Sequence, residues 1–150
     1  MITKKLRSLI FIPCGNMKFI DKINNMDYKP DAVILDLEDS VSDNSKNYAR
    51  NALSESVSKL SSFHVMVRVN SFQSPNFKLD IKHVMIDNVD AILIPKVNSS
   101  EIITKVSNIV IKLEKERGLN DKSTLLIPMI ESAQGIVSLN EISKSSDRVF

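Results

Sequence analysis

Carboxylate, guanidinium, amide and ammonium side chains recur where short apolar runs of the sequence end. In chain order they are Asp36, Glu38, Asp39, Arg68, Asn70, Lys96 and Glu131. If the apolar runs are the parallel strands of a β/α barrel, their carboxyl ends share one face, where barrel enzymes carry out their chemistry. The sequence therefore predicts a single polar site built from several strand ends.

Each of these residues also has a purely structural interpretation. Asp39 could cap a turn, Asn70 could form one, and Lys96 could be a solvated loop residue. Asp36 and Arg68 follow apolar runs at positions typical of burial, and a buried charge needs a partner. We expect these two to form part of a site, with a buried ion pair of no catalytic role as the alternative.

The composition is that of a globular chain with one hydrophobic core. Its 150 residues are 43% apolar and 25% charged, with 3 Gly and 5 Pro, which argues against disordered and low-complexity classes. The net charge of +2 provides no basic field for a nucleic-acid partner. The single cysteine, Cys14, can form neither an internal disulfide nor a Cys-x-x-Cys pair, which favours a cytoplasmic location.

The amino terminus resembles a signal peptide only superficially. Basic residues are followed by the apolar run 9–12. That run is too short to cross a membrane, and it ends at Pro13 without a small-residue cleavage site. We therefore expect neither a signal peptide nor a membrane span.

Strand-length runs rich in β-branched residues recur along the chain. They are Ser8–Pro13, Ala32–Leu37, His64–Val69, Ala91–Ile94 and Thr124–Met129, and Arg148–Phe150 has the character of a sixth beginning. The runs are almost continuously apolar rather than alternating, which is typical of parallel strands buried on both faces.

Apolar residues between these runs repeat with helical spacing. The clearest stripe covers 102–113, with Asn98 as the expected N-cap, Glu101 as its capping-box partner and Gly118 as the terminating residue. Further helices are expected after Asn16, after residues 43–45 and, most weakly, over 77–85.

The spacing of the strand starts, roughly 24 to 33 residues, is close to the ~31 per unit of a (β/α)8 barrel of ~250 residues. Length alone favours a five-stranded, flavodoxin-like doubly wound sheet. Against that fold, no Gly-rich phosphate turn follows the first strand, and the chain stops inside an apparent sixth strand. We therefore predict an α/β TIM barrel of which residues 1–150 supply about the first five units, as one domain whose remaining units lie outside this sequence.

Five ordered segments carry a family signature. They are residues 7–13 (RSLIFIP), 32–41 (AVILDLEDSV), 67–70 (VRVN), 94–97 (IPKV) and 127–135 (IPMIESAQG). In this order they resemble the motifs of the citrate lyase beta-subunit and malyl-CoA lyase family of the HpcH/HpaI aldolase superfamily. The resemblance extends from residue 7 to residue 150, and the block DLEDSV is its most diagnostic part.

The resemblance implies a Mg²⁺-dependent TIM-barrel lyase. Such an enzyme forms or cleaves a carbon–carbon bond between an oxo or hydroxy acid and a CoA thioester, as in citryl-, malyl- or citramalyl-CoA. A hard divalent cation held by oxygen ligands polarises the keto or hydroxy group and stabilises enolate-like charge. The resemblance also implies a homo-oligomer, a trimer or hexamer, with an oxo acid and an acyl-CoA as partners.

The resemblance also assigns roles to individual residues. Glu131 matches the first metal ligand, and Arg68 matches the arginine that grips the oxo acid through a planar fork. The acidic block holds the metal's waters or orients Arg68; its members are Asp36, Glu38 and Asp39. Further substrate-binding residues are Arg7 and Lys18, near the thioester phosphates, and Asn70 and Lys96 at the strand ends.

Two departures from the family pattern stand out. Cys14 occupies a position that is usually Gly or Ala, which we interpret as packing. The second metal ligand, an Asp in a Gly-x-x-Asp motif, would follow Phe150, and the general base would lie later still. The alternatives are therefore a truncated, non-catalytic interaction module and a flavodoxin-like binding domain.

Overall fold

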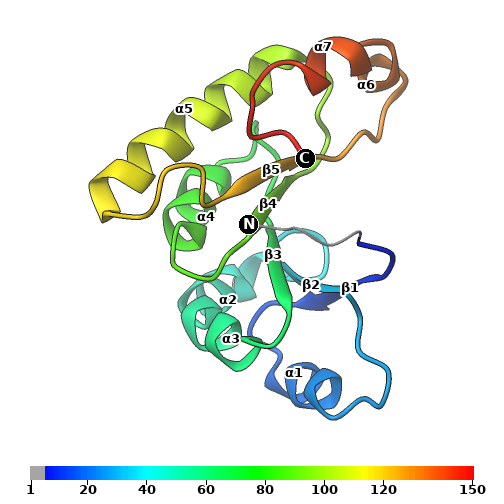
Figure 1. Cartoon of the computed structure of the whole chain (residues 1–150), viewed down its shortest axis with the longest axis vertical. Coiled ribbons are helices and arrows are strands. Elements are labelled where there is room, and N and C mark those ends of the chain that lie inside the picture. Colours follow the sequence, from blue (N-terminus) through cyan, green and yellow to red (C-terminus); the bar gives the residue numbers. More distant parts are fainter. Residues whose placement is uncertain (1–5) are drawn as a thin grey trace.

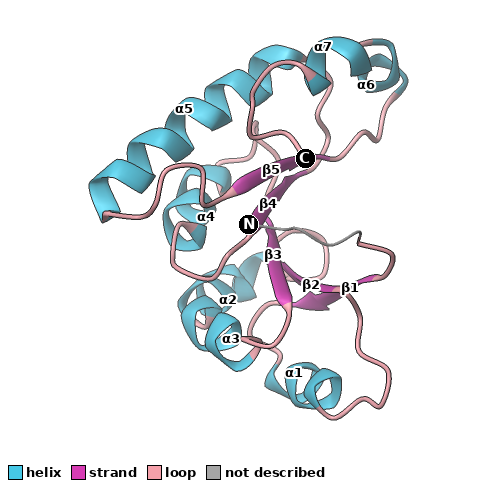
Figure 2. Cartoon of the chain, in the orientation of Figure 1, coloured by secondary structure: helices cyan, strands magenta, loops and turns pink. Residues whose placement is uncertain are grey.

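The computed structural model describes residues 6–150 and contains five parallel strands that alternate with helices (Figures 1 and 2). In chain order the elements are β1 (Leu9–Pro13), α1 (Met17–Asn24), β2 (Ala32–Asp36), the 3₁₀ turn η1 (Asp43–Ser45), α2 (Lys46–Asn51), α3 (Leu53–Lys59), β3 (His64–Arg68), α4 (Phe77–Val84), β4 (Ala91–Ile94), α5 (Ser100–Arg117), β5 (Leu125–Pro128), α6 (Ala133–Val137) and α7 (Leu139–Ser143). All five predicted strands are present to within one residue at either end.

The strands follow one another across the sheet in the order β1-β2-β3-β4-β5. Every neighbouring pair is parallel. This sequential order confirms the predicted progression of βα units and rules out a flavodoxin-like order, which would place β2 outside β1. Because the strands are parallel, the residues that follow all five lie at one rim of the sheet.

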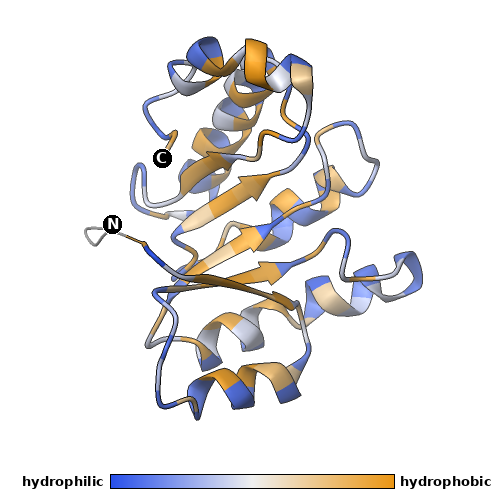
Figure 3. Cartoon of the chain, turned by 90° about the vertical axis from the view of Figure 1, so that its right-hand side faces the viewer, coloured by the Kyte–Doolittle hydropathy of each residue, from blue (hydrophilic) through white to orange (hydrophobic). Residues whose placement is uncertain are grey.

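The two faces of the sheet belong to two separate apolar clusters. Alternate strand residues point to opposite faces, so Val33 and Leu35 pack into the large core that includes the helices. Ile34, Met66 and Leu93 form a smaller cluster on the other face, which contains no helix residue. Helices α1 to α5 accordingly lie on one side of the sheet in Figure 1, and Figure 3 shows the strands as predominantly hydrophobic. Apolar side chains thus occupy both faces until each strand ends.

The helix predictions are confirmed in position but wrong at one cap. Helix α5 ends at Gly118, whose φ of 66° is left-handed as the C-cap requires. Its N-cap is Ser99 rather than Asn98, and no side chain caps it. With Ser99 as the N-cap, Glu101 is the second helical residue and not the third that a capping box requires. Its carboxylate pairs with Lys105, one turn ahead, at 2.6 Å.

The remaining helices differ in detail from the sequence pattern. The Asn16 side chain caps α1 by accepting a hydrogen bond from the Phe19 amide. The helix expected after residues 43–45 is divided at Ala52 into α2 and α3. The segment with the weakest pattern, 77–85, forms α4 almost in full.

The expected sixth strand is represented by a single parallel bridge, between Leu126 and Val149. The Leu126 amide donates to the Arg148 carbonyl (2.8 Å), and the Phe150 amide donates to the Leu126 carbonyl (3.0 Å). A bidentate ion pair between the buried Arg148 guanidinium and Glu114, at 2.8 and 2.6 Å, holds this segment against α5.

Candidate active site

An arginine–aspartate ion pair lies at the carboxyl ends of two neighbouring strands, β2 and β3. Asp36 and Arg68 are the last residues of β2 and β3 and are direct neighbours in the register. Arg68 donates to both carboxylate oxygens, from Nε at 2.8 Å and from Nη2 at 2.7 Å. The guanidinium also lies over the Phe11 ring, 5.0 Å from its centroid. The structure therefore pairs the two charges that the sequence placed at buried strand ends.

Asp36 also organises the loop that follows it. Its oxygens accept hydrogen bonds from the amides of Glu38 (2.8 Å) and Ser40 (2.9 Å). Burial opposes ionisation of Asp36, but the hydrogen bonds from Arg68, Ser40 and Glu38 outweigh it and hold its pKa below the usual range. The hydrogen bond to Asp36 in turn raises the pKa of Arg68. With four donors on two oxygens, Asp36 orients Arg68 and is poorly suited to bind a metal ion.

Glu38 places a second buried carboxylate beside the same guanidinium. Its Oε1 accepts a hydrogen bond from Lys96 Nζ at 2.9 Å. Its Oε2 lies 3.3 Å from Arg68 Nη1 as an ion-pair contact, and this buried oxygen has no hydrogen-bond partner among the described residues. A buried acceptor without a donor is costly, so Glu38 Oε2 is ready to accept a hydrogen bond from a ligand.

Lys96 reaches the cluster from the loop after β4. Its φ of 57° is left-handed, a conformation that few residues other than glycine adopt. The hydrogen bond to Glu38 raises its pKa, with smaller contributions from the charges of Asp39 and Glu131. Lys96 therefore brings a positive charge to the rim between two acidic side chains.

Asp39 and Glu131 are the exposed carboxylates of this rim. Asp39 is 3.5 Å from Arg68 and largely exposed, and Glu131 is exposed just beyond β5. Among residues 6–150, no three His, Cys, Asp or Glu side chains are grouped closely enough to hold a metal by themselves. Mg²⁺ commonly takes only one or two protein carboxylates and keeps several waters. The exposed oxygen donor of Glu131 fits that mode of binding.

Two predicted substrate-binding residues have other partners. The Asn70 side-chain amide is buried and donates to the Leu37 carbonyl (2.9 Å) and to Asp80 (2.6 Å). Arg7 precedes β1, at the opposite end of the sheet from Arg68, and its exposed side chain lies 3.5 Å from Asp31. The structure therefore assigns Asn70 to the support of the loop after β2 and does not bring Arg7 to the site.

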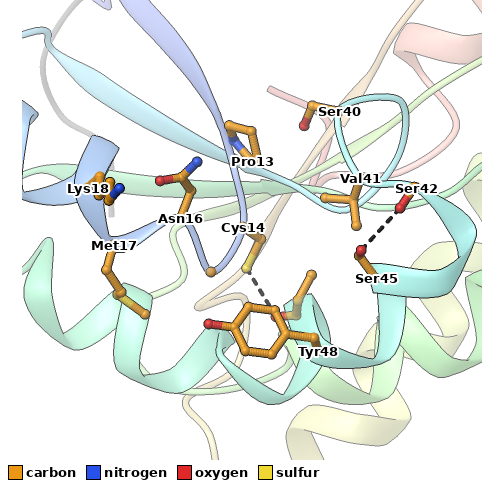
Figure 4. Close-up of a pocket in the computed structure, with 12 residues that line it drawn as sticks. Pro13, Cys14, Asn16, Met17, Lys18, Ser40, Val41, Ser42, Ser45 and Tyr48 are labelled. Atoms are coloured by element: carbon orange, nitrogen blue, oxygen red, sulfur yellow. Dashed lines mark hydrogen bonds between the residues drawn. The ribbon is translucent and has the colours of Figure 1, made fainter.

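Lys18 lines a cavity of about 670 Å³ beside the strand-end cluster. The cavity lies between the loop after β1 and the loop after β2, with Tyr48 and Ser45 along one wall (Figure 4). The loop after β1 contains Gly15, whose φ is 81°, and a Cβ at that position would lie 3.1 Å from both Ala52 and Tyr48. Because Lys18 and Ser40, which follows the acidic block, line the same cavity, the exposed Lys18 lies at the same rim as that block.

The sequence patterns missed two side chains of the site. Phe11 lies under the Arg68 guanidinium, and alternation along β1 is the signal that could have placed it on that face. Lys46 is buried and hydrogen-bonded to the loop that carries Glu38. No apolar periodicity points to it, because lysine at the start of a helix is ordinarily solvated.

Residues 7–150 match the family model HpcH/HpaI aldolase/citrate lyase. The chain belongs to the HpcH/HpaI aldolase/citrate lyase family. This membership agrees with the five motifs, and every member of the strand-end cluster lies inside the matched segment of the family. In the part of this family member that the structure describes, no helix is both long enough and apolar enough to span a bilayer.

Two named relatives match this chain over most of its length. Citrate lyase subunit beta of Haemophilus influenzae is 32% identical over 151 residues, which cover 98% of this chain and 50% of that protein. L-malyl-CoA/beta-methylmalyl-CoA lyase of Rhodobacter capsulatus is 32% identical over 124 residues, covering 79% of this chain and 39% of that protein. The chain thus spans about half the length of these HpcH/HpaI proteins.

A solved structure supports the fold. The citrate lyase beta subunit from M. tuberculosis, complexed with oxaloacetate and magnesium, matches with a TM-score of 0.69 at 23% identity. The match covers 94% of this chain and 54% of that chain. The five sequential βα units described above therefore share the fold of about half of that structure.

Proposed function

We propose that this chain is the amino-terminal part of a Mg²⁺-dependent carbon–carbon lyase acting on a CoA thioester or oxo acid, such as citryl-, malyl- or citramalyl-CoA. The observation that carries the proposal is the Arg68 guanidinium, fixed by Asp36 in two hydrogen bonds at the strand ends. The names of its relatives, citrate lyase subunit beta and malyl-CoA lyase, support this substrate class.

Arg68 is oriented before any substrate arrives. Asp36 engages Nε and Nη2, whereas Nη1 has a long hydrogen bond of 3.5 Å to the exposed Asp39 and an ion-pair contact of 3.3 Å to Glu38. An oxo-acid carboxylate that displaces Asp39 would find a donor already in place, which reduces the reorganisation needed for binding and for stabilising developing charge. Lys96 adds a second cation at the same rim.

The metal role falls to Glu131. Its exposed carboxylate would be the first protein ligand of the proposed Mg²⁺ site, and the exposed Asp39 would accept a hydrogen bond from a water at that site. Bound Mg²⁺ supplies a Lewis acid that polarises the substrate carbonyl. We place a second carboxylate ligand after residue 150, in the units that would complete the barrel.

The thioester part of the substrate is assigned to the cavity lined by Lys18. That cavity opens at the rim occupied by the acidic block, and the ammonium of Lys18 suits a phosphate group. The proposal also includes a cytoplasmic location, from the single cysteine, and a homo-oligomer, from the family resemblance.

A non-catalytic interaction module is the second candidate. It is favoured by the position of β1 at the edge of the sheet and by the exposed side chains of Leu9 and Phe11, at 44% and 45%. Unpaired strand edges are ready sites for pairing with another chain.

The two candidates differ in turnover. The protein as its gene encodes it is assayed with Mg²⁺ and a panel of malyl-, citramalyl- and citryl-thioesters. We expect cleavage to an oxo acid and an acyl thioester, abolished by EDTA and reduced about 10²- to 10³-fold in Arg68→Lys. Lys105→Gln, which removes an exposed lysine of α5, is the control and should retain the wild-type rate. Failure to turn over any of these thioesters would favour the interaction module.

A further inference from the structure

A buried ammonium lies beneath the loop that carries Glu38. Lys46, the first residue of α2, is only 6% exposed. Its Nζ donates to the main-chain carbonyls of Leu37 and Glu38, both at 2.9 Å. Burying an ammonium is unfavourable unless its N–H groups are satisfied. The fold thus commits a buried charge to two successive carbonyls of the acidic loop.

A second set of buried groups supports the same peptide. Asn70 Nδ2 also donates to the Leu37 carbonyl, and the Asn70 amide group and main-chain N–H both donate to Asp80 Oδ2. Arg50 Nη1 donates to Asp80 Oδ1 at 2.8 Å. Arg50 is one turn beyond Lys46 on α2. Through Asp80, this network therefore links α2 to α4 and to the residue that follows β3.

The loop is consequently held from two sides. Asp36 accepts hydrogen bonds from the main-chain amides of Glu38 and Ser40. Lys46 donates hydrogen bonds to the carbonyls of Leu37 and Glu38. Without the Lys46 ammonium, Leu37 O would keep the Asn70 donor at 2.9 Å, whereas Glu38 O would keep only the longer hydrogen bond from the Val41 amide, at 3.4 Å. The Glu38 peptide is therefore the part of the loop most dependent on Lys46.

We propose that Lys46 is a positioning residue, which sets the Glu38 peptide so that the Glu38 carboxylate meets Lys96 and Arg68. Lys46 itself touches no reacting group. The inference deepens the proposed function, and only the expected effect of Lys46 on enzymatic turnover rests on that function. The positioning itself can be measured without any substrate.

Amide hydrogen exchange tests the positioning directly. We expect Lys46→Met, in the protein as its gene encodes it, to accelerate exchange of the Glu38 and Ser40 amides about 10- to 100-fold, the equivalent of a lost hydrogen bond to a charged group. Val106→Ala, in the buried face of α5, is the control for general loss of stability. Lys46→Arg, which retains donors for the carbonyls, should restore most of the protection.

The outcomes separate this inference from the proposed function. Equal acceleration in Lys46→Met and Val106→Ala, or none in Lys46→Met, would overturn the positioning role whatever the enzymatic activity. If Lys46→Met does not fold, Lys46→Gln is compared with Val106→Ala by the same criterion. Inactivity of the wild-type protein toward thioesters would instead count against the proposed function and leave the exchange result standing.

Discussion

Replacing Arg68 by methionine would leave Asp36 as a buried carboxylate without its cation. Asp36 is fully buried, the Arg68 side chain is 13% exposed, and the replacement removes both charged hydrogen bonds between them. Removing one member of a buried ion pair typically destabilises a protein by about 3–5 kcal/mol. We expect a loss in that range for Arg68→Met at pH 6, and about 1.5–3 kcal/mol for Arg68→Lys, which keeps the charge but not the fork.

Urea unfolding followed by circular dichroism measures these losses, with the exposed Lys78→Met as a control expected to stay within about 0.5 kcal/mol of wild type.

The pKa of Asp36 is lowered in the folded protein. The ionised carboxylate therefore stabilises the fold above its unfolded pKa of about 4, and this contribution is lost as the pH falls through the folded pKa. In Arg68→Met, the buried Asp36 carboxylate has lost its cation, so protonation at low pH removes the cost of burying an unpaired charge. The difference between wild type and Arg68→Met should therefore shrink below about pH 4. A loss under about 1 kcal/mol at pH 6, or a difference independent of pH, would refute the account of a buried pair.

Three further predictions concern groups away from this pair. Gly135→Ala should destabilise the protein by about 1–3 kcal/mol in urea unfolding, because its Cβ would lie 2.6 Å from the Val97 carbonyl oxygen; a gain in stability would show that α6 shifts freely. Cys14, whose pKa burial raises to about 12, should react with a thiol reagent at pH 8 no faster than the protein unfolds, and rapid labelling of the native protein would contradict its burial. Glu114→Gln should cost about 3–5 kcal/mol and speed exchange of the Phe150 amide, whereas unchanged exchange would mean that the Arg148 ion pair does not hold the sixth-strand segment.

The strands and their order follow from the sequence because continuous apolar runs at regular spacing leave few other arrangements. The run Ala91–Ile94 is matched residue for residue. The pairing of Asp36 with Arg68 follows from the same reasoning, since two buried charges at the ends of adjacent strands must meet. Glu101 shows where local pattern fails, because a helix start one residue later than predicted removes it from the capping-box position.

The support beneath the site could not be predicted from local pattern. Lys46, Asn70 and Asp80 come from three segments and meet only after β2, β3 and α4 have packed. Each has a solvated or turn-forming interpretation that is usual for its residue type. Arg7 shows the converse, since it precedes β1, and the parallel strand order already places it at the opposite end of the sheet from the site that the family resemblance assigned to it.

Titration calorimetry of oxaloacetate into the protein as its gene encodes it tests the central claim most directly. The account predicts binding that requires Mg²⁺, weakens at least tenfold in Glu131→Gln, the scale of about 1.4 kcal/mol for a lost ligand contact, and also weakens in Arg68→Lys. Binding of equal strength in EDTA, or binding unaffected by both substitutions, would contradict a metal-dependent oxo-acid site at the strand ends.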